Sequence, residues 1–272
     1  MKASETPPVV LAIAAHDPLG GAGLAADLTT FAALGVHGTV AVTAVTAQHL
    51  DHVDRVEPVP TDLVAAQIDA IVESFPIAAV KTGLLGSAAI VDLVADRVAS
   101  GALPAPVVDP VLVDGRGNRF VGSDIERAYR ERLFPSAAML TPNLGEAAVL
   151  AGRPLDGADA VSSVAAELAG LGAGSVVVTG GDDPDALAVD VVVDRAGALT
   201  RLTGRWVDTP HVRGSGCTFA AATAAGLAAG RDPVDAAREA KAFVAARLEA
   251  STWPGLDSVG PVSHRFGPIR PD

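Results

Sequence analysis

Cysteine is almost absent from this chain, since Cys217 is the single one among 272 residues. A lone cysteine cannot form an intramolecular disulfide, and residues Met1 to Glu5 contain no apolar core of a secretion signal. Both absences lead us to expect a reducing cytoplasm. The six histidines show no paired spacing typical of metal ligands, and there is no Cys–His cluster for zinc, so a transition-metal enzyme is not expected.

Basic charge is also scarce. The 20 Lys and Arg residues against 32 Asp and Glu residues give a formal net charge of -12. Nucleic acids and anionic membranes need a basic surface that neutralises phosphate, so binding to either is not expected. Long apolar runs are missing too: the apolar helix candidate from Phe219 to Ala229 is far shorter than a bilayer span.

Aliphatic and small residues dominate what is present. Hydrophobic residues make up 49% and charged residues 19%, which indicates a compact globular protein. A chain of 272 residues is within what one α/β unit can bury around a large sheet. We therefore expect a single domain over residues 1–272.

Predicted strands and helices alternate along the chain. Short apolar runs predict strands, whereas apolar residues at helical spacing predict helices. Strands are predicted at 9–14, 38–43, 78–81, 107–108, 138–140 and 175–179, with a hairpin at 188–193 and 199–202. Helices are predicted at 24–34, 61–74 and 87–99, and from Cys217 and Pro233 onward. This alternation predicts an α/β fold whose mostly parallel sheet has helices on both faces, with ligands beyond the carboxyl ends of the strands.

A glycine-containing turn, residues 213–218, runs directly into the predicted helix at Cys217. Backbone N–H groups and the helix dipole converge on an anion at such a place, although the same sequence also fits a plain turn with a helix cap. Cys217 in the first turn is either a thiol whose pKa the dipole lowers or a small buried hydrophobe.

Polar residues follow several predicted strands. Asn143 and Glu146 stand one turn apart at a helix start, beside the crevice, and also fit an N-cap with its capping-box partner. Asp109 ends another strand and, with Glu146, is suited to holding Mg²⁺ through water. Asp27 and Gln48 are placed to face the same crevice, where a neutral heterocycle needs a donor and an acceptor. Taken singly, each also fits a solvated surface position.

Together these segments resemble the hydroxymethylpyrimidine/phosphomethylpyrimidine kinases of thiamin synthesis, which share the ribokinase-like fold with one class of pyridoxal kinases. The resemblance covers nearly the whole chain and rests on residues 17–28, 42–48, 81–85, 108–111, 141–144, 179–181 and 214–218. It implies a three-layer αβα sandwich and ATP-dependent phosphorylation of 4-amino-5-hydroxymethyl-2-methylpyrimidine and its monophosphate. It also implies a homodimer.

The resemblance further implies a role for individual residues. The implied pyrimidine pocket consists of Ala15, Asp27, Gln48, Leu84 and Val111, with Asp27 and Gln48 hydrogen-bonding the ring. The implied anion hole consists of the backbone amides of Gly214, Ser215, Gly216 and Cys217, with Cys217 near the attacking hydroxyl. The implied ATP residues are Asn143, Glu146, Thr179 and Gly181, and the implied Mg²⁺ residues are Asp109 and Glu146.

Several positions depart from the family pattern, and they cluster around the predicted pocket. They are Ala15 for a typical Gly, His16 for Ser or Thr, Leu19 for Ser or Gly, and Arg213 for His. Arg213 adds a cation beside the phosphate site, which would favour an already phosphorylated substrate. Most ribokinase-like enzymes carry an Asp base where this chain has Cys217, so its role as base or positioner stays open. Two alternatives therefore remain: a kinase for pyridoxal or another hydroxymethyl heterocycle, and a non-catalytic binding protein.

Overall fold

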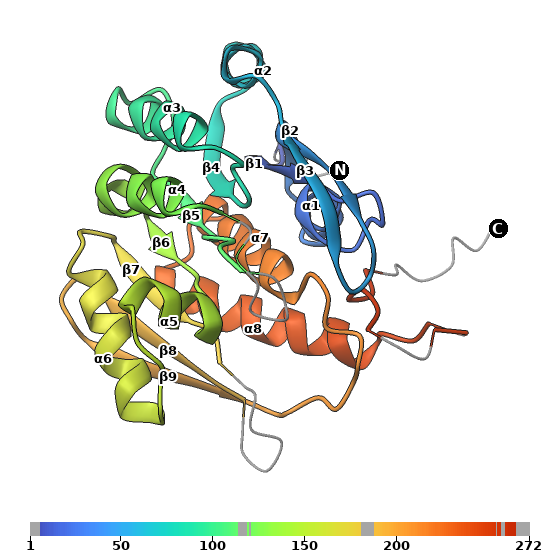
Figure 1. The fold of residues 1–272 in the computed structure, drawn as a ribbon, viewed down its shortest axis with the longest axis vertical. Helices are drawn as coiled ribbons and strands as arrows, with labels where there is room; N and C mark the ends of the chain where they lie inside the picture. Colours follow the sequence, from blue (N-terminus) through green and yellow to red (C-terminus); the bar gives the residue numbers. More distant parts are fainter. Residues whose placement is uncertain are drawn as a thin grey trace.

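The nine strands that the structure describes belong to one sheet (Figure 1). The computed structural model describes residues 6–113, 119, 121–180, 188–253, 255–256 and 259–264. The strands are β1 (Val9–His16), β2 (His37–Gln48), β3 (Val53–Pro58), β4 (Ile77–Thr82), β5 (Val107–Val108), β6 (Met139–Leu140), β7 (Ser175–Val178), β8 (Ala188–Asp194) and β9 (Leu199–Gly204). Their order is β3-β2-β1-β4-β5-β6-β7-β8-β9. The strands from β2 through β7 in that order pair in parallel, whereas β3, β8 and β9 pair antiparallel.

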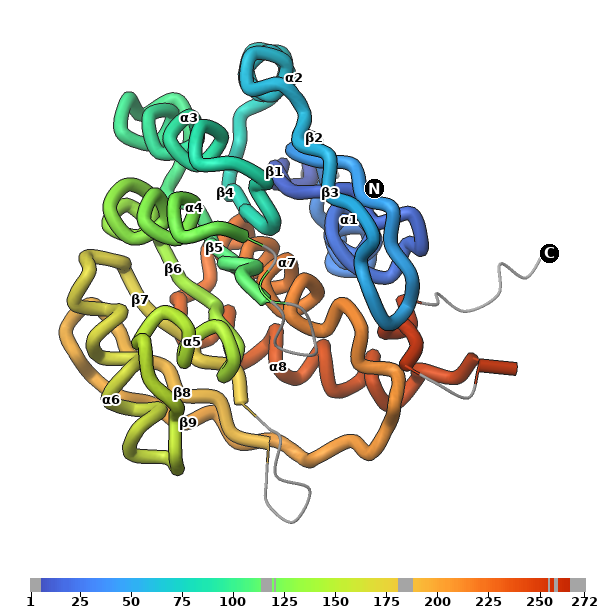
Figure 2. The backbone as a smooth tube through the Cα atoms, in the orientation of Figure 1, coloured from blue at the N-terminus to red at the C-terminus, as the bar shows by residue number. Residues whose placement is uncertain are grey.

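Helices cover both faces of this sheet, which confirms the predicted three-layer αβα sandwich (Figures 1 and 2). The α-helices are α1 (Gly23–Ala33), α2 (Thr61–Ser74), α3 (Ala88–Ala99), α4 (Ser123–Ala128), α5 (Leu144–Ala151), α6 (Ala158–Ala169), α7 (Ser215–Ala228) and α8 (Pro233–Glu249). A π-helical turn (Tyr129–Leu133) and a 3-10 turn (Phe134–Ser136) follow α4. Helices α1, α7 and α8 pack on one face, and α2 to α6 pack on the other. No helix in the described part of the chain is long and apolar enough to cross a membrane.

Strand β1 shows why a continuous apolar run forms the centre of the sheet. Its side chains alternate between the two faces, as in any strand. Leu11 and Ile13 belong to the core under α2 to α6, whereas Val10 and Ala12 belong to the core under α1, α7 and α8. Because both faces are buried, every position from Val9 to Ala15 is apolar and buried.

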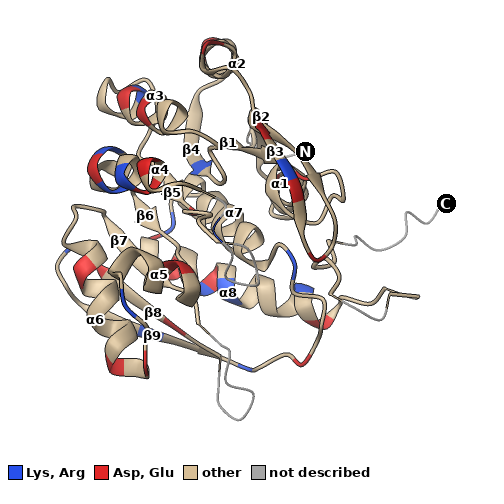
Figure 3. Ribbon diagram, viewed as in Figure 1, with Lys and Arg blue, Asp and Glu red and all other residues tan. Residues whose placement is uncertain are grey.

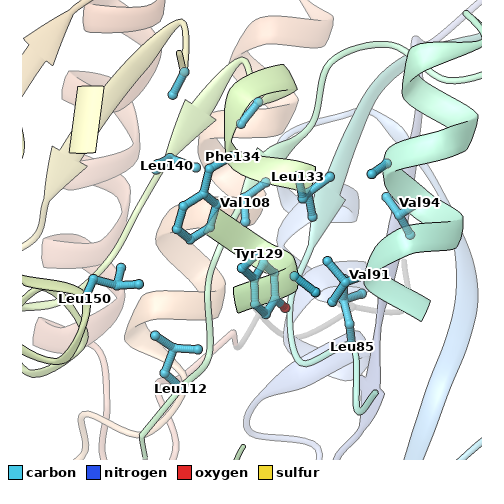
Figure 4. Close-up of a cluster of buried hydrophobic side chains, with 14 of the residues drawn as sticks. Leu85, Val91, Val94, Val108, Leu112, Tyr129, Leu133, Phe134, Leu140 and Leu150 are labelled. Atoms are coloured by element: carbon cyan, nitrogen blue, oxygen red, sulfur yellow. The ribbon is translucent and has the colours of Figure 1, made fainter. Parts of the chain in front are cut away.

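The core under α2 to α6 also positions the loop after β4 (Figure 4). The rings of Tyr129 and Phe134 pack with their centroids 5.6 Å apart among aliphatic side chains such as Leu133. The buried hydroxyl of Tyr129 donates a hydrogen bond to the carbonyl of Gly83 at 3.1 Å. This polar contact links an otherwise apolar cluster to a segment that reaches the crevice.

Some elements were not predicted from the sequence. Strand β3 extends β2 into a hairpin at the sheet edge, and four of its six residues are exposed. Its charged residues, including the exposed pair Arg55 and Glu57, break the apolar pattern of a strand and are typical of edges that avoid pairing with other chains. Helices α4 and α6 were also missed, whereas the predicted bounds of α2 are confirmed.

Candidate active site

A cavity of about 1260 Å³ opens beyond the carboxyl ends of the parallel strands. Its walls come from the ends of β1, β2 and β4, the start of α7, strands β8 and β9, and one side of α8. The predicted site residues that line it are Ala15, Gln48, Leu84, Asp109, Val111, Asn143, Glu146, Thr179, Gly214, Ser215, Gly216 and Cys217. Asp27 does not line it, and Gly181 lies outside the described residues.

The turn before α7 has a backbone that only glycine fits. Gly214 has φ +82°, and a Cβ there would collide with the carbonyl oxygen of Gly21 in the first glycine loop. The N–H of Ser215 donates to the carbonyl of Val212 at 3.1 Å, so this amide is already bonded. Among the described residues no acceptor takes the N–H groups of Gly216 and Cys217. These donors, at the positive end of α7, can bind an anion.

Asp17 holds the first glycine loop in place. One of its carboxylate oxygens accepts the N–H of Leu19 at 3.0 Å, and the other accepts the N–H of Ala22 at 2.9 Å. The second oxygen also lies 3.3 Å from Nη2 of Arg213, whose side chain is 14% exposed. The side-chain amide of Gln48 is assigned the orientation in which its oxygen accepts a hydrogen bond from Nη1 of Arg213 at 3.2 Å. Hydrogen bonds of Asp17 and Arg213 therefore connect the first glycine loop, the turn before α7 and the end of β2.

Asp27 and Lys81 form a fully buried ion pair behind the cavity wall. Nζ of Lys81 lies 2.9 Å from each carboxylate oxygen of Asp27, and both side chains are 0% exposed. Burial raises the pKa of Asp27 to about 6 even though Lys81 opposes the shift. Burial on its own would lower the pKa of Lys81, but the charge of Asp27 and of other acidic neighbours raises it above its ordinary value. Lys81 therefore remains charged.

This pair concerns one residue that was predicted from the sequence and one that was not. The structure places Asp27 against Lys81 and outside the residues that line the cavity, so its implied hydrogen bond to a heterocycle stays a prediction. Lys81 was not predicted as a site residue, yet it lines the cavity. Lys81 is the only Lys, Arg, Asp or Glu residue in the strands β1, β2, β4, β5, β6 and β7, whereas β3, β8 and β9 carry further charges (Figure 3). A lysine inside an otherwise apolar strand was therefore the signal that could have found it.

Cys217 lies in the first turn of α7, as predicted. Burial raises the pKa of Cys217 to about 12, although Lys81 acts in the opposite direction. The carboxylate of Asp109 lies beside the thiol on the cavity wall, and burial raises the pKa of Asp109 as well. Of the two alternatives that the sequence left open, the raised pKa favours a neutral buried thiol, because loss of water and nearby carboxylates outweigh the helix dipole.

Asn143 and Glu146 form the capping box that the sequence allowed. Oδ1 of Asn143 accepts the N–H of Glu146 at 2.9 Å, and Oε2 of Glu146 accepts the N–H of Asn143 at 3.0 Å. Oε1 of Glu146 also accepts the N–H of Leu112 at 3.3 Å. Burial, with a further contribution from Asp109, raises the pKa of Glu146 to about 8. Two buried carboxylates this close repel each other, and a divalent cation relieves that repulsion, so they fit Mg²⁺ bound through water.

A second buried pair lies farther along the same cavity. Nζ of Lys241 on α8 lies 2.9 Å from Oδ2 of Asp190 on β8, and Oδ1 of Asp190 accepts the N–H of Gly180 at 3.0 Å. Thr179 pairs with Asn143 in an isolated parallel bridge, which brings two of the implied ATP segments side by side. The sequence analysis did not identify Asp190 or Lys241. An aspartate inside the apolar run of β8 was the available signal.

The layered sheet, the cavity beyond its carboxyl ends and the free donors at the start of α7 are those of a ribokinase-like small-molecule kinase. The sequence profile described as phosphomethylpyrimidine kinase matches residues 17–263. A hydroxymethylpyrimidine/phosphomethylpyrimidine kinase of Streptomyces coelicolor is 39% identical over 95% of this chain and 95% of its own. The chain therefore belongs to the phosphomethylpyrimidine kinase family and is a kinase, which argues against the non-catalytic alternative.

Pyridoxal kinases are similar to the same degree. A pyridoxine kinase of Bacillus subtilis is 38% identical over 93% of this chain and 94% of its own. The structure of a pyridoxal kinase from Staphylococcus aureus in complex with AMP-PCP and pyridoxal superposes with a TM-score of 0.86. That match has 34% identity and covers 96% of this chain and 94% of the other. Family membership thus establishes that the chain is a kinase, whereas relatives of similar identity are named for different heterocyclic substrates.

Proposed function

We propose that residues 1–272 form one kinase domain that phosphorylates 4-amino-5-hydroxymethyl-2-methylpyrimidine and its monophosphate in thiamin biosynthesis, with ATP as the phosphoryl donor. The observation that carries the proposal is the pair of N–H groups at Gly216 and Cys217, which have no acceptor in the part of the chain that the structure describes. They lie on the same cavity as Ala15 and Gln48, the candidates for the pyrimidine pocket. Donors fixed in this way stabilise the charge of a phosphoryl group during transfer.

The side chains around these donors have separate roles in the proposal. Cys217 is protonated at neutral pH because of its raised pKa, so it does not act as a preformed thiolate. It positions the attacking hydroxyl, and its sulfur takes the hydroxyl proton as the new O–P bond forms, while its own S–H proton passes to Asp109 and the side chain stays neutral. Arg213 lines the cavity beside Gly214, and its charge supports the monophosphate as a second substrate. Gln48 presents its amide to the heterocycle from the end of β2.

In this proposal the nucleotide and its metal ion occupy the part of the cavity away from Gln48 and the heterocycle. The AMP-PCP bound to the S. aureus enzyme supports ATP as the donor for this chain. Asn143 and Thr179 border the proposed nucleotide site, and Gly181 is proposed there from the resemblance alone. Asp109 and Glu146 would hold Mg²⁺ through water, and the ion would neutralise charge on the phosphates.

Pyridoxal is the second candidate substrate. It is favoured by the 0.86 TM-score to the S. aureus pyridoxal kinase and by the 38% identity to the B. subtilis pyridoxine kinase. Both heterocycles carry a hydroxymethyl group, so the phosphoryl transfer would use the same donors at Gly216 and Cys217. The choice between them depends on the contacts that the ring makes with Gln48, Leu84 and Val111.

Mass spectrometry of products decides between these substrates. The protein is incubated with ATP, Mg²⁺ and, in separate reactions, the hydroxymethylpyrimidine, its monophosphate and pyridoxal. We expect monophosphate and then diphosphate from the pyrimidines. Pyridoxal phosphate as the only product would replace the first proposal with the second, and no product from any substrate would reject both.

Cys217→Ala tests the proposed division of roles within the same assay. We expect a lower kcat with nearly unchanged ADP affinity, because the side chain acts on the transferring group and not on the nucleotide. A parallel loss of ADP affinity would contradict that division.

We also propose, from the family resemblance, a homodimer located in the cytoplasm. Light scattering after size exclusion measures the oligomeric state.

A further inference from the structure

The turn that joins β2 to β3 gathers histidine and carboxylate side chains at the rim of the cavity. The N–H of His49 donates to the carbonyl of His52 at 2.8 Å and closes the turn. The two imidazole rings stack with centroids 4.4 Å apart and an angle of 13° between their planes. Leu50 and Asp51 of the same turn line the cavity. The spacing of these histidines along the chain did not predict a metal site, because a hairpin turn rather than a helix brings these two together.

Three side chains of this turn converge as a set of metal ligands does. One atom each from His49, His52 and Asp54 lies within 4.8 Å of the other two. Nε2 of His49 is 3.1 Å from Oδ2 of Asp54, and Nε2 of His52 is 3.2 Å from Oδ1. Two ligand atoms on a tetrahedral zinc ion are about 3.3 Å apart, so the observed N···O separations match an edge of that geometry.

The surroundings of His52 point independently to a cation at this place. Nδ1 of His52 lies 2.8 Å from a carboxylate oxygen of Asp51, while Nε2 faces the carboxylate of Asp54. A neutral imidazole that donates from Nδ1 leaves a lone pair on Nε2 facing a negative oxygen, which requires a proton or a metal ion between them. Asp51 bonded to the far nitrogen is the carboxylate–histidine–metal arrangement that orients ligands in known sites.

We propose that His49, His52 and Asp54 bind a divalent transition-metal ion of the Zn²⁺ class at the rim of the cavity, with Asp51 as the residue that orients His52. Imidazole nitrogen with one carboxylate suits Zn²⁺, Co²⁺ or Ni²⁺ better than Mg²⁺. The ligand side chains are 50% to 60% exposed, so an ion can enter from solvent and water can complete its coordination. The bound ion braces the turn that carries Leu50 over the cavity.

Calorimetric titration of the whole chain with Zn²⁺ tests the proposal. Excess Mg²⁺ is present throughout, so that Asp109 and Glu146 are already occupied. We expect one Zn²⁺ per chain, lost in His49→Ala and in His52→Ala. Asp51→Asn should weaken binding about 10- to 100-fold, as removal of an orienting carboxylate does elsewhere.

Two control variants separate this site from other ligands of the chain. His37→Ala removes an exposed histidine at the start of β2 and should leave the titration unchanged. Cys217→Ala should also leave it unchanged, because the thiol lies outside the proposed ligand set. Absence of binding to the wild-type protein, binding retained in both His49→Ala and His52→Ala, or binding lost in Cys217→Ala would each overturn the proposal.

Hydrogen exchange gives a second readout that does not depend on the histidine variants. Zn²⁺ should slow amide exchange at residues 49–54 of the wild-type protein, since the ion braces the turn. Asp54→Asn should remove this protection while circular dichroism shows a folded chain. Zn²⁺ that leaves exchange at residues 49–54 unchanged would also overturn the proposal.

Discussion

Two clusters of ionisable side chains lie at the same cavity and differ mainly in their contact with water. The buried cluster comprises Asp27, Lys81, Asp109 and Cys217, behind and along the inner wall. The turn cluster comprises His49, His52 and Asp54, at the rim. In the buried cluster every charge needs a protein partner, so the geometry is rigid. In the turn cluster water competes for each charge, so its members can exchange partners for an ion.

Removing one partner of the buried pair should have the largest effect on folding. Lys81→Met leaves Asp27 buried without a counter-ion, and we expect a loss of about 3 to 5 kcal/mol in the free energy of unfolding. Urea denaturation followed by circular dichroism measures the loss. The double variant Asp27→Leu with Lys81→Met should recover much of it, because no charge is then left unpaired.

The matched control is an exposed pair on the neighbouring hairpin. Arg55 and Glu57 have side chains that are 72% and 62% exposed, so Arg55→Ala should cost about 0 to 1 kcal/mol. If Arg55→Ala and Lys81→Met cost the same, burial would not be what separates the two clusters.

A comparison of two glycines tests how tightly the inner wall is packed. Gly214 and Gly197 both have φ +82°, but a Cβ would meet nothing within 4 Å at Gly197. Gly197→Ala should therefore cost only the backbone strain, about 1 to 3 kcal/mol. Gly214→Ala adds the collision with Gly21 and should cost more, and it should also abolish most of the phosphoryl transfer. Equal stability of the two variants would show that the turn before α7 can shift freely.

Stability should fall as the pH rises through the range set by Glu146. Its pKa in the folded protein, about 8, lies above the ordinary value of 4.5, so between these values the folded chain binds more protons than the unfolded one. The stabilisation is fully present below pH 4.5 and is lost as the pH approaches 8, with a slope of at most about 1.4 kcal/mol per pH unit.

Urea denaturation at pH 5, 6, 7 and 8 measures this slope. Glu146→Gln should reduce it, and Mg²⁺ should reduce it in the wild-type protein by favouring the charged carboxylate. Glu167→Gln is the control: Glu167 is exposed and Arg153 lowers its pKa, so this variant should not alter the slope above pH 5. An unchanged slope in Glu146→Gln would contradict the raised pKa.

The last of these effects concerns binding of the heterocycle rather than folding. Gln48→Ala should weaken binding of the heterocycle by about 1 to 3 kcal/mol, because the ring loses a directional hydrogen bond and Arg213 loses a partner. Calorimetry with the preferred substrate measures the loss. Unchanged affinity would remove Gln48 from the pocket and leave ring recognition to the inner wall.

The local patterns of the chain were enough to predict much of the fold. The apolar run of β1, the helical spacing of α2 and the capping box at Asn143 and Glu146 are set by residues close together in sequence. Edge strand β3 was missed because its exposed charges lack an apolar alternation. Of the residues predicted for the site, most line the cavity, whereas Asp27 faces Lys81.

The sequence by itself determined the α/β alternation, the glycine turn before α7 and membership in a kinase family, because each depends on local spacing or on motifs in order. Tertiary structure alone decided the ionisation of the site. The pKa of Cys217 depends on burial and on charges from β4 and the end of β5, which no local pattern encodes. The tertiary structure also decided which side chains far apart in the sequence are in contact, such as Asp27 and Lys81, which are 54 residues apart.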